Sequence, residues 1–382
     1  MKVIYFSQTF FSDCDFPLIR QLQKKKVQVY YFMPLPDYLK KQGLVNVKKM
    51  KERIGIFKAS EYEELNIYKD YIDLNQIFFL NIPIHTRRII QRIFWVYVFI
   101  KMLFINADIF HFTWQLSRFE KILYFLPCIK AMTVHDPISH SCITDPMEEK
   151  NRKLAFGKAS KYILLSKGLV NQFSLKYNIS LKNIFFSKMG EFDHLRYLRE
   201  EKTSINQPYI LFFGQITSSK GLEYLCKAMT EVHRNHPNVQ LVIAGRGRIY
   251  FDYEPFKNLD YIILKNEYLE LETISTLLKH ALFTVLPYKD ATQSGVVQTA
   301  FSCNSPLIVT NVGGLPESVK DGITGLVIPP KDVNSLENAI NNLLDNSEVL
   351  QSFRENIDKI WRPQMDWSII AEDYIKLWKS IL

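Results

Sequence analysis

Apolar and polar positions along the chain form two alternating patterns. Short runs of β-branched and aromatic residues are separated by longer stretches in which apolar residues recur at helical spacing. This alternation is typical of βαβ units, whose strands lie parallel in one sheet. In the first half it predicts strands at Val3–Ser7, Val27–Phe32, Ile109–Phe112, Ala131–Val134, Tyr162–Leu165 and Ile184–Phe186. The clearest helix between them is Arg87–Leu103.

A polar segment, Glu200–Pro208, interrupts this pattern with the composition of an interdomain linker. A second α/β series follows it. The predicted strands are Tyr209–Phe213, Val239–Ala244, Tyr261–Leu264, Phe283–Leu286, Leu307–Thr310 and Leu326–Ile328. The predicted helices are Leu222–His233, Leu269–Leu278, Gly295–Phe301 and Val333–Leu344, and the tail Trp367–Leu382 is helical and amphipathic.

The chain of 382 residues, 47% of them hydrophobic, is long enough for two domains with their own cores. We therefore predict an α/β protein with two doubly wound, Rossmann-like domains, the first over residues 1–200 and the second over residues 208–365. Because ligands of such domains bind at the carboxyl ends of the strands, the expected site lies in a cleft between the domains.

The formal net charge is +9, and basic patches lie between Lys24 and Arg53 and between Arg87 and Arg92. Such patches attract nucleic acid or an anionic membrane, although an ordinary solvated surface accounts for them equally well. A nucleic-acid-binding protein is disfavoured, because the sequence carries no recognised binding motif.

The five cysteines are scattered and lack CxxC spacing, which favours a reducing compartment over a disulfide framework or a zinc site. The opening run MKVIYFSQ is too short for a signal peptide, and the apolar run Ile93–Phe104 is broken by Lys101. We therefore expect a cytoplasmic protein, either soluble or bound peripherally to the cytoplasmic face of a membrane.

Two strand–loop–helix turns in the second half suit a phosphate. The first runs from Gly214 through Gln215 to Lys220, with a helix opening near Gly221. Free N–H groups at a helix start, beside the charge of Lys220, attract an anion. An ordinary βα turn has the same pattern, so this signal is weak when taken alone.

The second turn leads from Asp290 to a helix start at Ser294 and Gly295. Gly295 permits close approach of the backbone to a diphosphate, and Thr299 lies one helical turn further on, on the same side. The alternative is a simple capped helix, because Ser294 is a good N-cap.

A third segment carries a specific resemblance. Residues 310–317 read TNVGGLPE and residues 321–330 read DGITGLVIPP, after the strand Leu307–Thr310. Together with Gly245-Arg246-Gly247 and Leu286-Pro287-Tyr288, they resemble the donor-binding half of glycosyltransferase family 4, retaining enzymes of the GT-B fold. The strong match covers about residues 208–350.

The first half is similar to the family more weakly, through segments at residues 108–111, 133–136, 165–167 and 187–190. The family's glycine-containing loop after the first strand is missing, and residues 7–13 read SQTFFSD. The resemblance also implies that the C-terminal helix, residues 366–382, packs back toward the first domain.

The resemblance implies a nucleotide-diphosphate sugar as co-substrate, with no metal ion and no other cofactor. Its implied donor-binding residues are Gly214, Gln215, Lys220, Gly245, Ser294, Gly295, Gln298 and Thr299. Lys220 matches a lysine that contacts the diphosphate, whereas Gln215 stands where the family has arginine. Asp290 matches a carboxylate that orients the sugar hydroxyls. The second carboxylate of that motif falls on Thr299 or Gln298, depending on where one inserted residue lies.

In the first domain, the resemblance places His135 beside the transferred sugar and makes His135, Lys220 and Asp290 the catalytic set. A histidine at a strand end is more often structural. The implied acceptor or lobe-interface residues are Gln8, Thr9, His111 and Asp136. Glu317 follows a proline in the first turn of a helix, so capping explains it as well as binding.

The expected reaction is transfer with retention, in which the leaving diphosphate serves as the base and is stabilised by Lys220 and by amides at Ser294 and Gly295. Basic and aromatic residues over 87–97 resemble an interfacial helix, which suits a glycan or lipid-linked acceptor, although a core helix with a basic outer face fits equally. Surface polysaccharide assembly is the expected setting.

Two alternatives keep the same fold. One is a catalytically degenerate partner or scaffold protein, suggested by Gln215, Thr299 and the missing glycine loop. The other is a sugar phosphorylase or epimerase, which only product analysis separates from a transferase.

Overall fold

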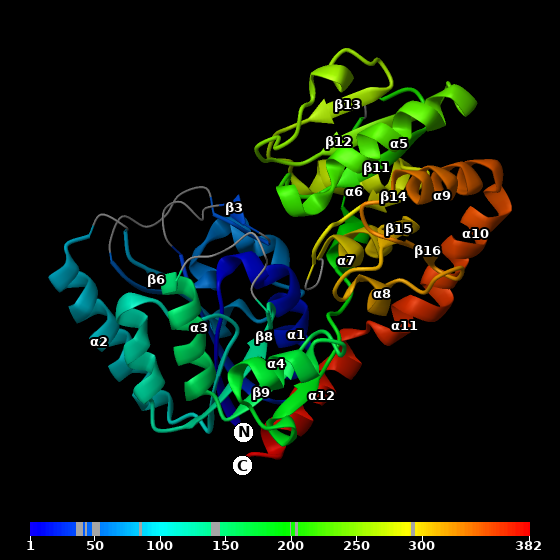
Figure 1. Cartoon of the computed structure of the whole chain (residues 1–382). Helices are drawn as coiled ribbons and strands as arrows, with labels where there is room; N and C mark the ends of the chain where they lie inside the picture. Colours follow the sequence, from blue (N-terminus) through cyan, green and yellow to red (C-terminus); the bar gives the residue numbers. More distant parts are fainter. Residues whose placement is uncertain are drawn as a thin grey trace.

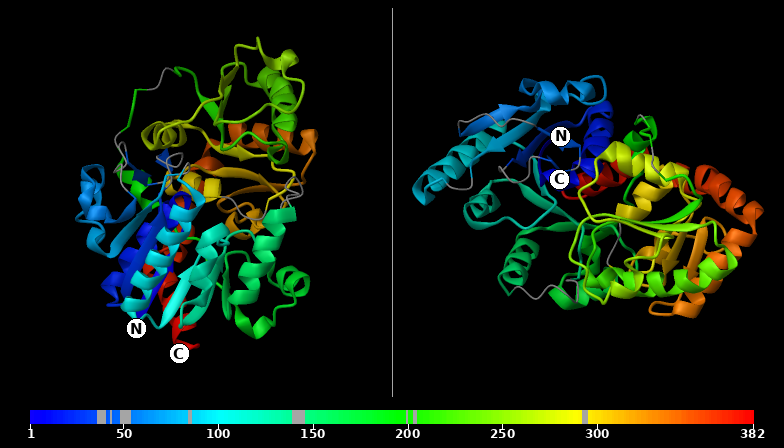
Figure 2. Two further views of the ribbon diagram at one scale, coloured as in Figure 1. Left: turned by 90° about the vertical axis from the view of Figure 1, so that its left-hand side faces the viewer. Right: turned by 90° about the horizontal axis from the view of Figure 1, so that it is seen from above.

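The computed structural model of the chain describes residues 1–35, 41–42, 44–47, 54–83, 86–138, 146–198, 200–202, 205–291 and 295–382. It consists of two α/β domains, each built around its own large sheet (Figure 1). Both termini lie together at the end of the first domain that points away from the second (Figures 1 and 2).

The sheet of the first domain has the strand order β10-β9-β8-β7-β1-β2-β6-β5 within the described residues. Its strands are β1 (Lys2–Phe6), β2 (Gln28–Pro34), β5 (Gly55–Lys58), β6 (Ile77–Asn81), β7 (Ile109–Phe112), β8 (Ile129–Val134), β9 (Lys161–Leu164) and β10 (Ile184–Phe186). A small antiparallel pair, β3 (Lys41–Gln42) and β4 (Val45–Asn46), lies apart from it. The central strands are nearly continuous apolar runs, because both faces of the sheet are covered by helices.

The α-helices of the first domain are α1 (Ser12–Lys24), α2 (Arg88–Ile105), α3 (Pro146–Lys158) and α4 (Val170–Tyr177). Helix α2 begins and ends within two residues of the predicted Arg87–Leu103. In Figure 1 it stands at the outer edge of the domain, away from the second domain.

The prediction of a purely parallel first sheet was incomplete. The pattern missed β5 and β6, and β5 runs antiparallel to β6 at the edge of the sheet. Strand β5 is only four residues long and mostly half-buried, so it carries no continuous apolar run that would mark it as a strand.

The second domain has a parallel sheet of strand order β13-β12-β11-β14-β15-β16. Its strands are β11 (Tyr209–Phe213), β12 (Gln240–Ala244), β13 (Ile262–Lys265), β14 (Thr284–Leu286), β15 (Leu307–Thr310) and β16 (Gly325–Ile328). Its α-helices are α5 (Leu222–Asn235), α6 (Leu271–His280), α7 (Gly295–Ser302), α8 (Leu315–Ser318), α9 (Val333–Asp345), α10 (Ser347–Asn356) and α11 (Arg362–Gln364). All six predicted strands of this half are present.

The last helix, α12 (Trp367–Lys379), packs beside α1 on the first domain (Figure 1). Tyr374 and Trp378 are buried in the same hydrophobic cluster as Val3 and Phe16. The chain therefore crosses between the domains twice, once after β10 and once before α12.

The carboxyl edges of the two sheets face each other. The loop that follows β9 in the first domain is hydrogen-bonded to Glu317 in α8, which follows β15 in the second domain. The loop after β9 and helix α8 after β15 thus lie on the sides where the two domains meet.

Candidate functional site

Three loops of the second domain touch at the carboxyl edge of its sheet, because glycine lets their backbones meet. Gly245 directly follows β12 with φ +148°, and a β-carbon there would lie 1.9 Å from the carbonyl oxygen of Gly214. Gly221 has φ +68°, and a β-carbon there would lie 2.0 Å from the carbonyl oxygen of Pro287. No side chain fits at either position, so glycine holds the loops after β11, β12 and β14 together.

A cation and a buried phenol meet at this junction. The ammonium of Lys220 lies 3.6 Å from the centre of the Tyr288 ring. Tyr288 is fully buried, and its hydroxyl has no hydrogen-bond partner among the described residues. A β-carbon on Gly214 would lie 3.7 Å from that hydroxyl, so the phenol points at the glycine loop. The junction therefore offers one positive charge and one unused polar group.

Gln215 is exposed in the loop after β11. The next residue, Ile216, donates its N–H to the carbonyl oxygen of Arg246 at 3.0 Å and forms a bridge with Gly247. Arg246 is an exposed cation on the loop beside Gln215. Sequence reasoning noted the Gly-Arg-Gly segment without giving Arg246 a role, although its position directly after a predicted strand was a usable signal.

The prediction of a free helix start at Gly221 needs correction. The N–H of Leu222, the first residue of α5, donates to the hydroxyl of Tyr250 at 2.9 Å. That hydroxyl in turn donates to Glu223 at 2.8 Å, and the other oxygen of Glu223 is paired with Lys289 at 2.6 Å. Burial, with this hydrogen bond to Glu223, raises the pKa of Tyr250. A side chain from a distant loop thus occupies an amide that was expected to face the ligand.

Helix α7 opens at Gly295, which is exposed and has room around its α-carbon. Ser294 lies outside the described residues. The hydroxyl of Thr299 donates to the carbonyl oxygen of Gly295 at 2.8 Å, so this hydroxyl is engaged within the helix and does not point freely outward. Gln298 is buried, and its side-chain oxygen has no hydrogen-bond partner among the described residues. Asp290 is half-buried just after the Lys289 that pairs with Glu223.

The first domain presents an aromatic cluster at its carboxyl edge. His135 follows β8 and stacks on Phe11, with 3.8 Å between ring centroids. Phe10 and Trp114 pack edge to face at 5.9 Å, and Phe11 contacts both. Phe10 is 41% exposed. Burial lowers the pKa of His135 to about 4, an effect that the charge of Asp136 opposes, so the ring is neutral near pH 7.

The other residues predicted for this edge are polar, and most of their polar groups are engaged or buried. Gln8 is half-buried, and its carbonyl accepts the N–H of Phe11 at 3.0 Å. Thr9 is buried, and its hydroxyl has no partner in the described part of the chain. The carbonyl of Asp136 accepts a hydrogen bond from Arg152. The aromatic loop that carries Gln8 and Thr9 takes the place of the missing glycine loop.

The structure contradicts an acceptor role for His111. The side chain has no exposed surface, and its ring nitrogens lie 2.8 Å from the hydroxyl of Thr133 and 3.2 Å from the indole nitrogen of Trp378. Burial lowers its pKa to about 3, with a smaller contribution from His135. His111 joins the first sheet to α12 and belongs to the core.

The structure also shows that Glu317 is not a capping residue of α8. Its carboxylate accepts hydrogen bonds from the loop after β9 in the other domain. Sequence reasoning could not find this contact, because its partners lie about 150 residues earlier in the chain.

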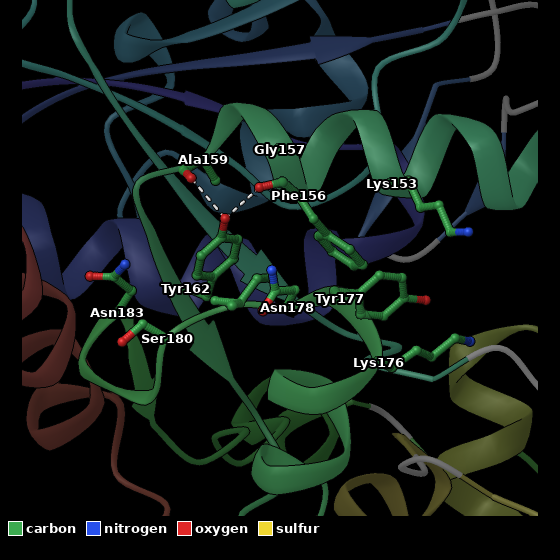
Figure 3. Close-up of a pocket in the computed structure, with 11 residues that line it drawn as sticks. Lys153, Phe156, Gly157, Ala159, Tyr162, Lys176, Tyr177, Asn178, Ser180 and Asn183 are labelled. Atoms are coloured by element: carbon green, nitrogen blue, oxygen red, sulfur yellow. Dashed lines mark hydrogen bonds between the residues drawn. The ribbon is translucent and has the colours of Figure 1, made fainter.

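A separate pocket lies on the first domain, between α3, β9 and α4 (Figure 3). Lys153 and Lys176 stand at its margin, and Tyr162 donates to the backbone carbonyls of Phe156 and Ala159. None of the predicted site residues lines it. The candidate site is therefore assigned to the facing carboxyl edges of the two sheets.

These features define a GT-B protein: two Rossmann-like domains with facing carboxyl edges and a last helix that returns to the first domain. Residues 207–346, which make up most of the second domain, match the family described as "Glycosyl transferases group 1".

Among relatives with known names, the alpha-D-kanosaminyltransferase of Streptomyces kanamyceticus is 25% identical over 251 residues, which are 63% of this chain and 65% of that protein. The glycogen synthase of Mycobacterium tuberculosis is 28% identical over 166 residues, 42% of this chain and 40% of that protein. The matches thus span less than two thirds of either relative.

Solved structures share the fold along the entire chain. The sucrose-phosphate synthase of Thermosynechococcus elongatus superposes with a TM-score of 0.71 at 16% identity, covering 100% of this chain and 99% of that one. Anabaena HepE in complex with UDP-glucose gives a TM-score of 0.70 at 13% identity, with 100% of both chains covered. In the part of the chain that the structure describes, no helix has the length and apolarity needed to cross a bilayer.

Proposed function

We propose that this protein is a retaining glycosyltransferase that moves a sugar from a nucleotide-diphosphate sugar to a glycan or lipid-linked acceptor in surface polysaccharide assembly. The observation that carries the proposal is the pairing of Lys220 with Tyr288 beside Gly214, inside the segment that matches group 1 glycosyltransferases. Anabaena HepE, which shares the fold, was solved with UDP-glucose.

The donor diphosphate would lie over the loop after β11 and the start of α7. Lys220 supplies one positive charge there, and Arg246 on the adjoining loop supplies a second cation where Gln215 supplies none. The amides that open α7 at Gly295 add a positive dipole end. The Tyr288 hydroxyl and the side-chain oxygen of Gln298, both without partners among the described residues, are available to a bound nucleotide.

In the proposed reaction, the bond between the sugar and the diphosphate breaks and negative charge develops on the leaving phosphate. Lys220 stabilises that charge electrostatically, and the phosphate takes the proton of the acceptor hydroxyl as the new bond forms on the same face. Asp290 orients the sugar hydroxyls, and neutral His135 lies beside the transferred sugar as a hydrogen-bonding group. The proposed reaction requires no metal ion.

The acceptor would bind the aromatic cluster of the first domain. Phe10 is exposed and Trp114 is half-buried at the carboxyl edge of the first sheet, and aromatic rings suit the apolar side of a sugar ring. Gln8, Thr9 and Asp136 supply nearby polar groups. We propose no nucleic-acid partner.

We further propose that the protein works on the cytoplasmic face of an anionic membrane. Helix α2 exposes Ile93, Val96, Ile100 and Phe104 to solvent, while Phe94 and Val98 on its other side are buried. The N-terminal end of this apolar stripe carries three exposed arginines, Arg87, Arg88 and Arg92. An apolar stripe flanked by cations is the composition of a helix that lies in a membrane interface.

The proposal is tested by measuring thermal stability with several nucleoside diphosphates and nucleotide sugars, because a bound ligand stabilises the folded state by mass action. One diphosphate should raise the midpoint of unfolding, and the matching nucleotide sugar should be consumed with an acceptor. The anomeric configuration of the product, read by NMR, should equal that of the donor. Inversion of configuration, or no binding of any donor, would contradict the proposal.

The engagement of the Thr299 hydroxyl within α7 and the absence of a cation at Gln215 favour one alternative, a non-catalytic partner of another transferase. Slow hydrolysis of the bound nucleotide sugar in the absence of acceptor, lost in Lys220→Ala, excludes it. A protein that binds nucleotide but neither hydrolyses nor transfers the sugar supports it.

A further inference from the structure

The carboxylate of Glu317 links the two domains by three hydrogen bonds. It accepts from the hydroxyl of Ser166 at 2.7 Å, from the N–H of Lys167 at 2.8 Å and from the N–H of Gly168 at 2.8 Å. Glu317 is in α8, directly after the Gly-Gly turn of the second domain, whereas its three donors form the loop after β9 in the first domain. We name this contact the Glu317 clasp.

The absence of a side chain at Gly168 leaves room for the Glu317 carboxylate. A β-carbon at this position would lie 2.8 Å from a carboxylate oxygen of Glu317, and the other neighbour within 4 Å is the carboxyl carbon of the same side chain. The φ angle of Gly168 is outside the left-handed range, so any side chain could adopt its backbone conformation. Space for the carboxylate is therefore the local reason for glycine here.

The two chain crossings link the domains separately. Glu191, after β10, receives the indole N–H of Trp367 on its carbonyl at 2.7 Å and pairs with Arg362, and its own N–H donates to the carbonyl of Met365. The crossings are thus bound to each other and form a hinge. A hinge leaves the angle between two rigid bodies free, whereas a further contact at the facing edges restricts it.

We propose that Glu317 is a positioning residue for sugar transfer: its clasp fixes the angle between the lobes at which donor and acceptor meet. This inference rests on the proposed function, because it needs the donor on the second domain and the acceptor on the first. Each substrate is held by a different rigid body, so the distance between the reacting atoms depends on the interlobe angle. Transfer requires those atoms within about 3.5 Å, and a displacement of about 1 Å costs as much as a hundredfold in rate.

The clasp is suited to adjusting geometry rather than to holding the fold together. Glu317 is exposed, so water competes with its three donors and the contact adds little to the stability of the fold. Three convergent donors on one carboxylate still fix its direction, because charge-assisted bonds to backbone amides are short and directional. Removal of the carboxylate should therefore change the distribution of lobe angles with little change in unfolding stability.

The experiment compares Glu317→Ala, Glu317→Gln and the matched control Glu348→Ala, an exposed glutamate on α10. We expect Glu317→Ala to lower kcat for transfer about tenfold to a hundredfold. The Kd for the nucleoside diphosphate should be unchanged, and the radius of gyration from small-angle scattering should change. Glu317→Gln keeps one oxygen acceptor and should recover part of the rate. Glu348→Ala should behave as the unaltered protein.

A double-mutant cycle tests the Glu317 clasp through Gly168, which lies in the first domain. Gly168→Ala should reproduce the loss in kcat, because its methyl group displaces the carboxylate. The double variant Gly168→Ala with Glu317→Ala should be no slower than Glu317→Ala alone, because the displaced group is already absent. Losses that multiply would show that Gly168 acts independently of Glu317 and would overturn the proposal.

Other results also overturn it: an unchanged kcat in Glu317→Ala, or a weaker nucleotide Kd that explains the entire loss. If the unaltered protein binds no nucleotide and transfers no sugar, the proposed function fails, and scattering alone then tests the clasp. Variants whose radius of gyration equals that of the unaltered protein would show that Glu317 does not set the lobe angle.

Discussion

The ammonium group of Lys220 lies over the ring of Tyr288, 3.6 Å from its centre, although the two residues belong to different βα turns of the second sheet. The loops that carry them are fixed by backbone contacts, one of which is the hydrogen bond from the N–H of Lys289 to the carbonyl of Ser219 at 2.7 Å. The position of the cation is thus set before any ligand binds. Preorganised charge is what stabilisation of a leaving diphosphate requires.

Lys220→Ala should weaken binding of the nucleoside diphosphate about 10- to 100-fold, because a charged hydrogen bond contributes about 1.5–3 kcal/mol. Isothermal titration calorimetry measures the change. The matched control is Lys227→Ala, an exposed lysine of α5 in the same domain, which should leave the Kd unchanged. Equal losses in both variants would mean that only the overall charge of the domain matters.

Tyr288→Phe tests the unused phenol. The hydroxyl is buried without a partner among the described residues, so its removal takes away a desolvation cost and should stabilise the ligand-free protein by about 1 kcal/mol. Tyr209→Phe is the control, because the Tyr209 hydroxyl donates to the carbonyl of Leu277 at 2.7 Å and its loss should cost about 1 kcal/mol. Urea unfolding measures both changes. Equal destabilisation by the two substitutions would show that Tyr288 has a partner.

The approach of the glycine loops gives a third prediction. Gly245→Ala places a methyl group 1.9 Å from the Gly214 carbonyl oxygen at a left-handed φ, and it should destabilise the second domain by about 3 kcal/mol or more. Gly157→Ala, in α3 with nothing within 4 Å, should leave stability unchanged or raise it by about 0.5 kcal/mol. The two variants are compared by the denaturant concentration at the midpoint of unfolding. Comparable stability of both variants would mean that the loops after β11 and β12 can move apart.

The elements that sequence predicted well are those whose signal is local. Strands β7, β10 and β11 match their predicted bounds, because each is an apolar run that ends at polar or turn residues. The edge strand β5 was missed, since a short, half-exposed strand has no such run. The loops predicted to hold the donor do meet at one edge of the second sheet, but the contacts of Leu222 with Tyr250 and of Glu317 with Ser166 were not foreseen. Pairings across 28 and 151 residues leave no trace in local periodicity.

The buried His111 predicts a pH dependence of stability. Its pKa is about 3 in the folded protein and about 6.5 when unfolded, so the unfolded chain binds more protons between these values. The free energy of unfolding is therefore unaffected by His111 titration above pH 6.5. It decreases as the pH falls toward 3, by about 1.4 kcal/mol for each pH unit well inside this window. In His111→Gln, that part of the dependence should vanish from urea unfolding measured at pH 5 and pH 6.5.

Several buried groups contribute to the pH dependence of stability, so the contribution of His111 is obtained only by subtracting the pH dependence of His111→Gln from that of the unaltered protein. Burial also raises the pKa of Asp13 and Asp15 to about 7, and these carboxyls act with the opposite sign, because the unfolded chain releases their protons first as the pH rises from 4 to 7. His135 and His194, with pKa values of about 4, act in the same direction as His111. An identical pH slope in both proteins would show that His111 is protonated in the folded state.

Helix α2 gives the final prediction, which concerns membrane binding. Ile93 and Phe104 are 62% and 83% exposed on the outer side of the helix, and Arg88 and Arg92 are exposed near its start. The protein should sediment with vesicles containing phosphatidylglycerol, more weakly with pure phosphatidylcholine, and less at high salt. Each cation near such a surface contributes about 1 kcal/mol, so Arg88→Glu with Arg92→Glu should weaken binding at least about 30-fold.

The apolar surface is tested separately by Ile93→Asp with Ile100→Asp, which should abolish vesicle binding while leaving nucleotide affinity unchanged. The control is Leu175→Asp, at a leucine of α4 that is 83% exposed but lies outside this stripe. An exposed apolar stripe also suits contact between two copies of the chain, so light scattering should be measured on the same variants. A dimer that dissociates in Ile93→Asp with Ile100→Asp, from a protein that never binds vesicles, would assign the stripe to self-association. The cations beside it would then be ordinary solvated surface.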